Sequence, residues 1–284
     1  MKNILLPTDY SATANNAFIY ALHLANKFGV KLYVLYSYTA PVLSAVHAGQ
    51  PEMLSTVYQE IEQSKHEYSQ RKNKELIELA KQHNLNTDNT FFLFENDTVL
   101  GSVAKTIQDQ DISLIVMGVR GNNAESQSTI GSNTASVIRN IQLPVLVVPR
   151  NASYEEINKI AFTTLFREKD FEPLKQIVDI SKMVEGHVYC VHVQNEDSNT
   201  VSTLAQSNSW SNYFKEHNVD FVILDKKGTI EETINTYISQ NNIDVLAMVK
   251  RNRNFFDRLI RSSLTNKMTL HSEIPIFVFH EHKD

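Results

Sequence analysis

The residues best suited to chemistry lie in one segment, residues 112–149. Within it, Gly118, Gly121 and the pair Gly131-Ser132 have the spacing Gly-x2-Gly-x9-Gly-Ser. A glycine directly after a strand lets the backbone turn with a positive φ and lets a bulky anion approach the main chain. Free N–H groups at the start of a helix, the positive end of its dipole and a serine hydroxyl suit a phosphate group. The segment therefore indicates an anion site, unless these glycines merely end a strand and start a helix.

The elements around these glycines are a strand at 112–117, a loop at 118–130, a helix at 132–140 and a strand at 145–148. Short apolar runs without alternation are typical of strands that are covered on both faces. A helix between two such strands predicts a parallel βαβ unit. The loop then lies at the carboxyl end of a parallel sheet, where ligands bind in such folds.

The glycine spacing resembles the nucleotide-binding signature of the universal stress protein family, since it follows a strand that ends VMG and precedes a strand that reads PVLVVP. The start of the chain, NILLPTDYSATANNAFIYALHLANKFG, resembles that family's first strand, its Pro-Thr-Asp turn and its first helix. The two stretches together cover the first half of the chain. They imply membership of the family and of its ATP-binding subclass.

The resemblance implies that Asp9 contacts the nucleoside or metal side of the ligand and that the position of Ser37 lies against adenine. The family often has an aliphatic residue where this chain has Ser37. Asp9 also has a second possible role, because Asp9 and Ser11 both precede a helical run and either side chain could cap it. The ligand implied is ATP, or else AMP, with Mg²⁺ balancing the phosphates. The predicted binding residues are Thr8, Asp9, Ser37, Gly118, Arg120, Gly121, Gly131, Ser132 and Asn133.

Composition excludes several other classes. The 284 residues carry a net charge of −5, which argues against general affinity for nucleic acid or anionic membranes. No apolar run reaches the roughly 18 residues of a membrane span. Cys190 is the single cysteine, so no disulfide can form within the chain. Because Met1 leads within three residues into a strand, we expect no signal peptide and a cytoplasmic protein.

The rest of the first half predicts an alternating α/β unit. Strands are expected at 4–6, 30–36 and 90–94, and helices from Ser11 to Gly29, at 52–83 and at 98–108. Crossovers wound in both directions from the first strand would place helices on both faces of a five-stranded parallel sheet. The charged part of the long helix is a solvated face or a partner surface. Its candidate buried positions are Leu54, Val57, Tyr58, Ile61, Tyr68, Leu76, Ile77 and Leu79.

The chain contains an internal repeat. A shift of 131 positions lays DTVLGSVAKTIQDQDISLIVMG over GTIEETINTYISQNNIDVLAMV, and a shift of about 156 aligns the two first strands. We therefore predict two tandem domains of the universal-stress-protein-like, or adenine nucleotide alpha hydrolase-like, α/β fold. The first repeat spans residues 1–150 and the second repeat spans residues 151–284.

The second repeat has lost the residues of the predicted site. Gly118, Gly121, Gly131 and Ser132 align with Val249, Asn252, Ser262 and Ser263, and Asp9 aligns with Leu165. The side chain of Val249 would crowd the space through which a ligand approaches Gly118, and Leu165 cannot replace the carboxylate of Asp9. We predict that the second repeat binds no nucleotide in the family's mode. Its basic loop, 250–261, is a solvated loop or a site for a phosphate or an acidic partner.

Three functions stay open. The first is a tandem universal stress protein whose first domain binds ATP and signals under stress with little or no turnover. The second is a slow ATP hydrolase, for which Arg120 and Asp9 are the available residues, since no Walker loop or nucleophile motif is present. The third is a nucleotide-free interaction module, favoured by the degenerate second repeat, by Ser37 and by Glu125 in a loop that should attract anions. The resemblance further implies that the last strands, 145–148 and 276–278, pair within one chain, which can then form a homodimer.

Overall fold

The computed structural model describes residues 1–41, 51–119, 130–194, 200–250 and 274–281. The first repeat contains, in order, β1 (Asn3–Thr8), α1 (Ala12–Phe28), β2 (Leu32–Tyr38), α2 (Pro51–Gln82), β3 (Thr90–Asn96), α3 (Val99–Gln110), β4 (Ile112–Gly118), α4 (Ser132–Asn140) and β5 (Val145–Val148). The second contains β6 (Lys159–Thr163), a 3₁₀ turn (Glu168–Asp170), α5 (Phe171–Val184), β7 (His187–Gln194), α6 (Thr200–Tyr213), β8 (Val219–Asp225), α7 (Ile230–Asn241), β9 (Val245–Lys250) and β10 (Ile276–His280).

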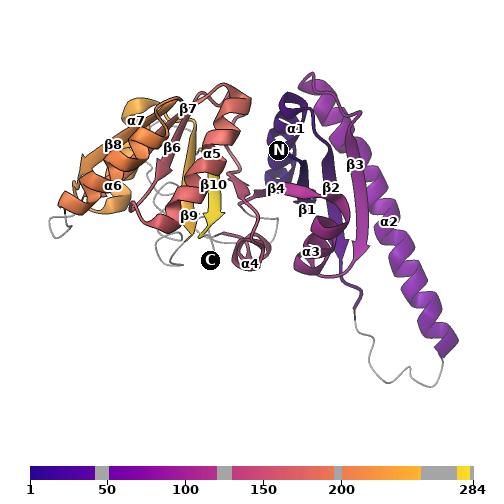
Figure 1. The fold of residues 1–284 in the computed structure, drawn as a ribbon. Helices are drawn as coiled ribbons and strands as arrows, with labels where there is room; N and C mark the ends of the chain where they lie inside the picture. Colours follow the sequence, from indigo (N-terminus) through magenta and orange to yellow (C-terminus); the bar gives the residue numbers. More distant parts are fainter. Residues whose placement is uncertain (42–50, 120–129, 195–199, 251–273, 282–284) are drawn as a thin grey trace.

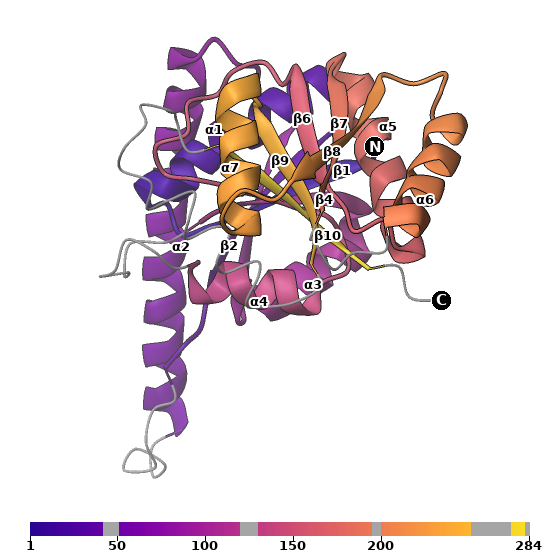
Figure 2. The same cartoon turned by 90° about the vertical axis from the view of Figure 1, so that its left-hand side faces the viewer.

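The ten strands of the described residues form one sheet in the order β3-β2-β1-β4-β5-β10-β9-β6-β7-β8. Helices cover both faces of this sheet (Figures 1 and 2). One face packs against α1, α2, α5 and α6, which contribute Phe18, Leu76, Leu174 and Trp210 to the first core cluster. The other packs against α3, α4 and α7 through Val103, Val137 and Ile234. The predicted fold class, two tandem five-stranded α/β units, is confirmed.

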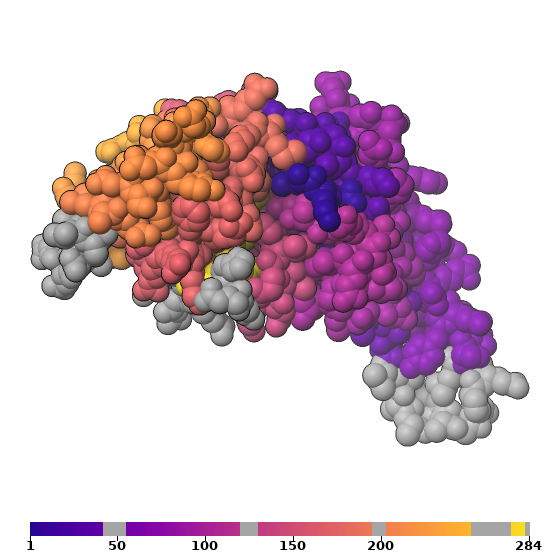
Figure 3. Space-filling view, viewed as in Figure 1, coloured from indigo at the N-terminus to yellow at the C-terminus, as the bar shows by residue number. Residues whose placement is uncertain are grey.

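The two repeats meet through their last strands. β10 pairs antiparallel with β5, so that Ile276 lies opposite Val147 and Val278 opposite Val145. Every other pair of neighbouring strands in the described part of the chain is parallel. The last-strand pairing that the family resemblance implies is therefore present within a single chain. Figure 3 shows the repeats as two lobes joined side by side.

Equivalent contacts recur in both repeats at the predicted offsets. Thr98 caps α3 by accepting from the N–H of Gly101, and Thr229, 131 positions later, caps α7 by accepting from the N–H of Glu232. The carboxyl ends of the same helices are also capped alike. The Asn3 amide donates to the Gln110 carbonyl of α3, and the Lys159 ammonium donates to the Asn241 carbonyl of α7. The two repeats thus make the same helix-capping contacts at equivalent positions, even where different residues make them, as with Asn3 and Lys159.

Several element ends differ by one or two residues from those expected, and part of α2 is more exposed than expected. β2 begins at Leu32 instead of Val30, because Gly29 ends α1 in the left-handed region with φ 64° and the Val30 N–H still bonds to the Ala25 carbonyl. Of the positions of α2 that were predicted to be buried, Leu76 is buried and Tyr58 is 37% exposed. The side chain of Leu54 lies outside the described residues, and the remaining positions are only partly buried: Val57, Ile61, Tyr68, Ile77 and Leu79. Tyr58 is exposed because the first half of the 32-residue α2 extends past the end of the sheet (Figures 1 and 2).

Hydropathy adds one observation about the helices. Among the residues that the structure describes, no helix combines the length and the apolar character needed to cross a lipid bilayer.

Candidate functional site

The candidate site is formed where three neighbouring strands end. β1 lies between β2 and β4, and Thr8 of β1 stands opposite Tyr36 of β2. The chain winds outward from β1 in both directions, through β2 to β3 and through β4 to β5. Ligands of open parallel sheets bind in the crevice at such a switch point, beyond the carboxyl ends of the strands. Thr8, Ser37 and Gly118 all lie at this edge.

The turn after β1 is built from its own side chains. Thr8 is buried, and its Oγ1 accepts from the N–H of Tyr10 at 3.0 Å. The exposed Asp9 accepts from the N–H of Ser11 at 3.0 Å, and Ser11 Oγ accepts from the N–H of Ala14 at 3.1 Å. Ser11 is therefore the N-cap of α1. Asp9 shapes the turn and leaves an exposed carboxylate just after the carboxyl end of β1.

Gly118 has a role that the glycine spacing did not reveal. The expectation that it turns the backbone with a positive φ is wrong, because among the described glycines only Gly29 and Gly228 have positive φ. A Cβ on Gly118 would lie 2.8 Å from Thr13 Cγ2 and 3.1 Å from the Thr13 carbonyl carbon and oxygen. The missing side chain therefore lets the first turn of α1 pack closely against the end of β4.

The start of α4 is held at the end of β4 and lacks a side-chain cap. Gly131, its N-cap residue, has φ −59° and ψ 148° and supplies no side-chain hydrogen bond. The Gly131 N–H donates to the Val119 carbonyl at 2.7 Å, and Thr134 Oγ1 donates to the Gly118 carbonyl at 2.9 Å. Ser132 and Asn133 are exposed. By contrast α1, α3 and α7 each have a serine or threonine cap, so α4 differs from them in having no cap from the side chain of its N-cap residue.

Ser37 faces the same side of the sheet as α4. By strand alternation it follows Tyr33 and Leu35, which belong to the core cluster that contains Val137 and Ile138 of α4. Its hydroxyl oxygen is buried and has no hydrogen-bond partner among the described residues. A buried hydroxyl is normally paired, so this oxygen is suited to a ligand group.

Three tyrosines, which sequence reasoning did not assign to the site, cluster near the carboxyl ends of β1 and β2. The ring centroids of Tyr10 and Tyr36 are 5.1 Å apart, and each lies 5.9 Å from that of Tyr68. The Tyr10 hydroxyl donates to Asn73 Oδ1 at 2.8 Å. Burial, and secondarily the neighbouring tyrosines, raises the pKa of Tyr10 and Tyr36, so these phenols stay neutral. Because the three positions share no sequence period, only the fold brings them together.

Two predicted site residues, Arg120 and Gly121, lie outside the described residues. So does Glu125, and so does the predicted basic loop, apart from Lys250. The structure therefore brings together Thr8, Asp9, Ser37, Gly118 and the start of α4 from the predicted set.

The second repeat is built differently at the equivalent edge. Leu165, in the place of Asp9, is 44% exposed. The fully buried Asp170 accepts from Thr164 Oγ1 at 2.9 Å and from the Leu165 N–H at 3.1 Å. A 3₁₀ turn precedes α5, which begins only at Phe171, and Val249 is buried in the core. In the second repeat, therefore, the Asp170 carboxylate stabilises the turn, and Val249 occupies the position of Gly118.

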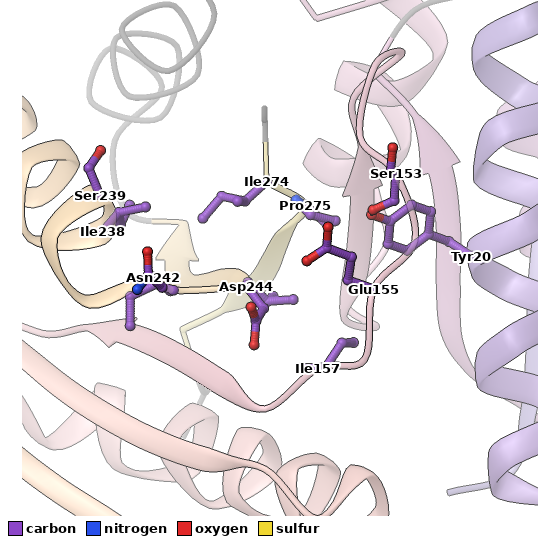
Figure 4. A pocket seen from close by; sticks show the side chains of 12 residues that line it. Tyr20, Ser153, Glu155, Ile157, Ile238, Ser239, Asn242, Asp244, Ile274 and Pro275 are labelled. Carbon is purple, nitrogen blue, oxygen red and sulfur yellow. The ribbon is translucent and has the colours of Figure 1, made fainter. Parts of the chain in front are cut away.

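A separate cavity of about 220 Å³ lies at the amino-terminal ends of β9 and β10, between the segment that joins β5 to β6 and the end of α7 (Figure 4). Glu155 and Asp244 line it together with Tyr20, whose hydroxyl bonds to the Ser153 carbonyl. Burial raises the pKa of Tyr20, and the negative charges of Glu155 and Asp244 contribute to the increase. Two carboxylates oppose the binding of a phosphate, so this cavity does not compete for a nucleotide.

Comparison with known proteins decides the family. A model described as the Universal stress protein family matches residues 1–149. The chain belongs to the universal stress protein family. A universal stress protein of the cyanobacterium Synechocystis sp. is 25% identical over 293 residues, covering 98% of this chain and all of the relative. A universal stress protein of Methanocaldococcus jannaschii is 24% identical over 150 residues, covering 52% of this chain and 82% of the relative.

The tandem arrangement of this universal stress protein has solved counterparts. A universal stress protein from Archaeoglobus fulgidus superposes with a TM-score of 0.68 at 18% identity, covering 99% of this chain and 98% of its own. A putative universal stress protein from Pseudomonas aeruginosa has a TM-score of 0.56 at 11% identity, with coverage of 98% and 93%. At these identities the likeness establishes the fold of the whole chain and nothing further.

Proposed function

We propose that this universal stress protein binds one adenine nucleotide, ATP or AMP, in its first repeat only. The observation that carries the proposal is the uncapped start of α4, fixed at the carboxyl end of β4 by the Gly131 and Thr134 hydrogen bonds. The start of a helix that has no side-chain cap, at the switch point of a parallel sheet, is a usual setting for a phosphate. The glycine spacing of the family's nucleotide signature leads into the same helix.

The described residues fit the chemistry of a nucleotide with its metal. The N–H groups of Ser132 and Asn133 would donate to phosphate oxygens, since the Gly131 N–H already donates to the Val119 carbonyl. The exposed Asp9 carboxylate, just after the end of β1, would contact the nucleoside or the Mg²⁺ that balances the phosphates. Arg120 and Gly121 complete the proposed set from the sequence.

Ser37 is proposed to contact the adenine base. Its buried hydroxyl has no partner among the described residues, and it lies on the face of the sheet that carries α4. A hydroxyl can both donate to and accept from a heteroaromatic ring. The serine therefore offers polar recognition where an aliphatic residue would offer only contact.

The second repeat is proposed to have no such site. Leu165 stands where the first repeat has the Asp9 carboxylate, and Ser262 stands where it has Gly131. Asp170 cannot take over the role of Asp9, because it is fully buried and already accepts from Thr164 and Leu165. One nucleotide per chain follows from this difference.

The role that fits these features is stress-responsive regulation in the cytoplasm, in which nucleotide occupancy is the signal and turnover is slight. The protein could act as a single chain with paired repeats or as a homodimer of such chains. The described residues include no group of three or more His, Cys, Asp or Glu side chains placed to hold a metal ion, so Mg²⁺ is proposed to arrive with the nucleotide.

Calorimetric titration with ATP and Mg²⁺, followed by an assay for released ADP, tests the proposal. We expect one site per chain and no ADP. Gly131→Val should abolish binding and leave the circular dichroism spectrum unchanged, whereas Ser262→Val, the matched change in the second repeat, should leave binding intact. ADP release would indicate a slow hydrolase instead, and absence of heat would indicate a nucleotide-free interaction module.

A further inference from the structure

Lys250, the last residue of β9, reaches from the second repeat to α4 of the first. Its Nζ donates to the Ile138 carbonyl at 3.0 Å. This carbonyl is one of the last four of α4, which have no N–H partner inside the helix. An ammonium group at this end satisfies the carbonyl and opposes the negative end of the helix dipole.

The sheet junction brings the two groups together. β10 joins β5 to β9, and Lys250 stands opposite His280 at the end of that ladder. Val137 and Ile138 of α4 pack in the same core cluster as Val278 of β10 and Met248 of β9. The end of β9 therefore lies beside the end of α4.

The contact is partly shielded from water. Lys250 is half-buried, and burial lowers its pKa, with nearby Arg139 lowering it further. Hydrogen bonds and charge interactions are stronger where water is partly excluded. The contact thus differs from an exposed surface ion pair such as Lys2 with Asp111, which contributes little.

The first repeat has no equivalent of this lysine. The position that aligns with Lys250 is Val119, whose side chain cannot donate a hydrogen bond. Val119 acts through its backbone instead, because its carbonyl accepts from the Gly131 N–H at the start of α4. The two aligned positions therefore hold opposite ends of the same helix.

We propose that Lys250 is a positioning residue for α4, through which the second repeat sets the nucleotide affinity of the first. The inference rests on the proposed nucleotide site. Ile138 is six residues beyond Ser132, so about 9 Å along α4 separates the phosphate-binding end from the carbonyl held by Lys250. Coupling between two such ends is reciprocal, so nucleotide binding in turn stabilises the Lys250 contact and the end of β9.

Hydrogen exchange of the full chain, read by mass spectrometry, tests the positioning without nucleotide. Lys250→Met should speed exchange of the amides of α4 about two- to fivefold, the range expected for losing a charge at a helix end. Lys250→Arg should restore the wild-type rate, because a guanidinium can donate to the same carbonyl. Lys159→Met is the matched control, since Lys159 caps α7 by donating to Asn241 and should affect α7 alone.

Titration of the same variants with ATP and Mg²⁺ tests the effect on affinity. Lys250→Met should weaken binding about two- to fivefold, with Lys250→Arg and Lys159→Met near wild type. Unchanged exchange in α4 of Lys250→Met would overturn the positioning role, whatever the nucleotide result. Faster exchange with unchanged affinity would overturn the coupling. If the wild type binds no ATP, the proposed function and the coupling both fall, while the exchange result still decides the positioning role.

Discussion

The close approach of α1 to Gly118 makes a quantitative prediction about stability. An alanine at position 118 would place its Cβ 2.8 Å from Thr13 Cγ2 and 3.1 Å from the Thr13 carbonyl carbon and oxygen. Cβ contacts below 3.0 Å essentially never occur, so the neighbour has to move. Two of the three contacts involve backbone atoms, so rotating the Thr13 side chain cannot relieve them.

Overpacking of this kind costs about 1–3 kcal/mol of the free energy of unfolding. Part of the cost comes from Thr13 Cγ2 and should disappear when that methyl group is removed. Thr13→Ser keeps the hydroxyl and deletes only this atom. In the Thr13→Ser background we therefore expect Gly118→Ala to cost about 0.5–1 kcal/mol less than in the wild type, a coupling typical of residues in contact.

Urea unfolding of the wild type, the two single variants and the double variant, followed by circular dichroism, measures this coupling. The reasoning is refuted if Gly118→Ala costs less than about 0.5 kcal/mol, the range of a neutral surface substitution. It is refuted equally if the cost is the same in both backgrounds. A loss of ATP binding without loss of stability would show instead that Gly118 serves the ligand directly.

Three further predictions concern other contacts. His23 stacks on Tyr154 with ring centroids 3.6 Å apart, and burial, followed by His83, lowers the pKa of His23. The unfolded chain therefore takes up this proton at a higher pH than the folded chain does, so the free energy of unfolding should decrease as the pH falls through about 6.5. His23→Gln should show a smaller decrease between pH 7.5 and 5.5, measured by urea titration. An equal fall in both proteins would contradict this. Glu185 ends α5 in the left-handed region with φ 61°, as Gly29 ends α1. Because glycine adopts this conformation without strain, Glu185→Gly should raise the free energy of unfolding by about 0.5–1 kcal/mol. A decrease would show that the contacts of the Glu185 side chain matter more than the backbone strain. Asp170→Ala should lower the free energy of unfolding by about 2–4 kcal/mol, because the Thr164 hydroxyl and the Leu165 N–H lose a charged acceptor. A decrease of less than about 1 kcal/mol would contradict the role of Asp170 in holding this turn.

The parts of the fold that local chemistry determines could be predicted from the sequence. α4 and β5 occur at the expected residues, because an apolar run bounded by glycine or proline restricts the possible ends. α1 ends where Gly29 supplies the left-handed residue. The antiparallel β5–β10 pairing was implied by the family and not by any local pattern.

The parts that depend on distant neighbours could not be predicted. The spacing of Gly118 indicated an anion, but its nearest neighbour is Thr13, more than a hundred positions earlier. Asp170 was missed because it lies five positions beyond the alignment partner of Asp9. Lys250 looked like one member of a basic loop, and only the β5–β10 junction places it at Ile138.

The asymmetry between the repeats is tested most directly by counting bound nucleotides. Native mass spectrometry of the full chain with ATP and Mg²⁺ should show a single nucleotide added to the wild type and none added to Gly131→Val. Two nucleotides on the wild type, or one retained by Gly131→Val, would contradict a single site at the start of α4.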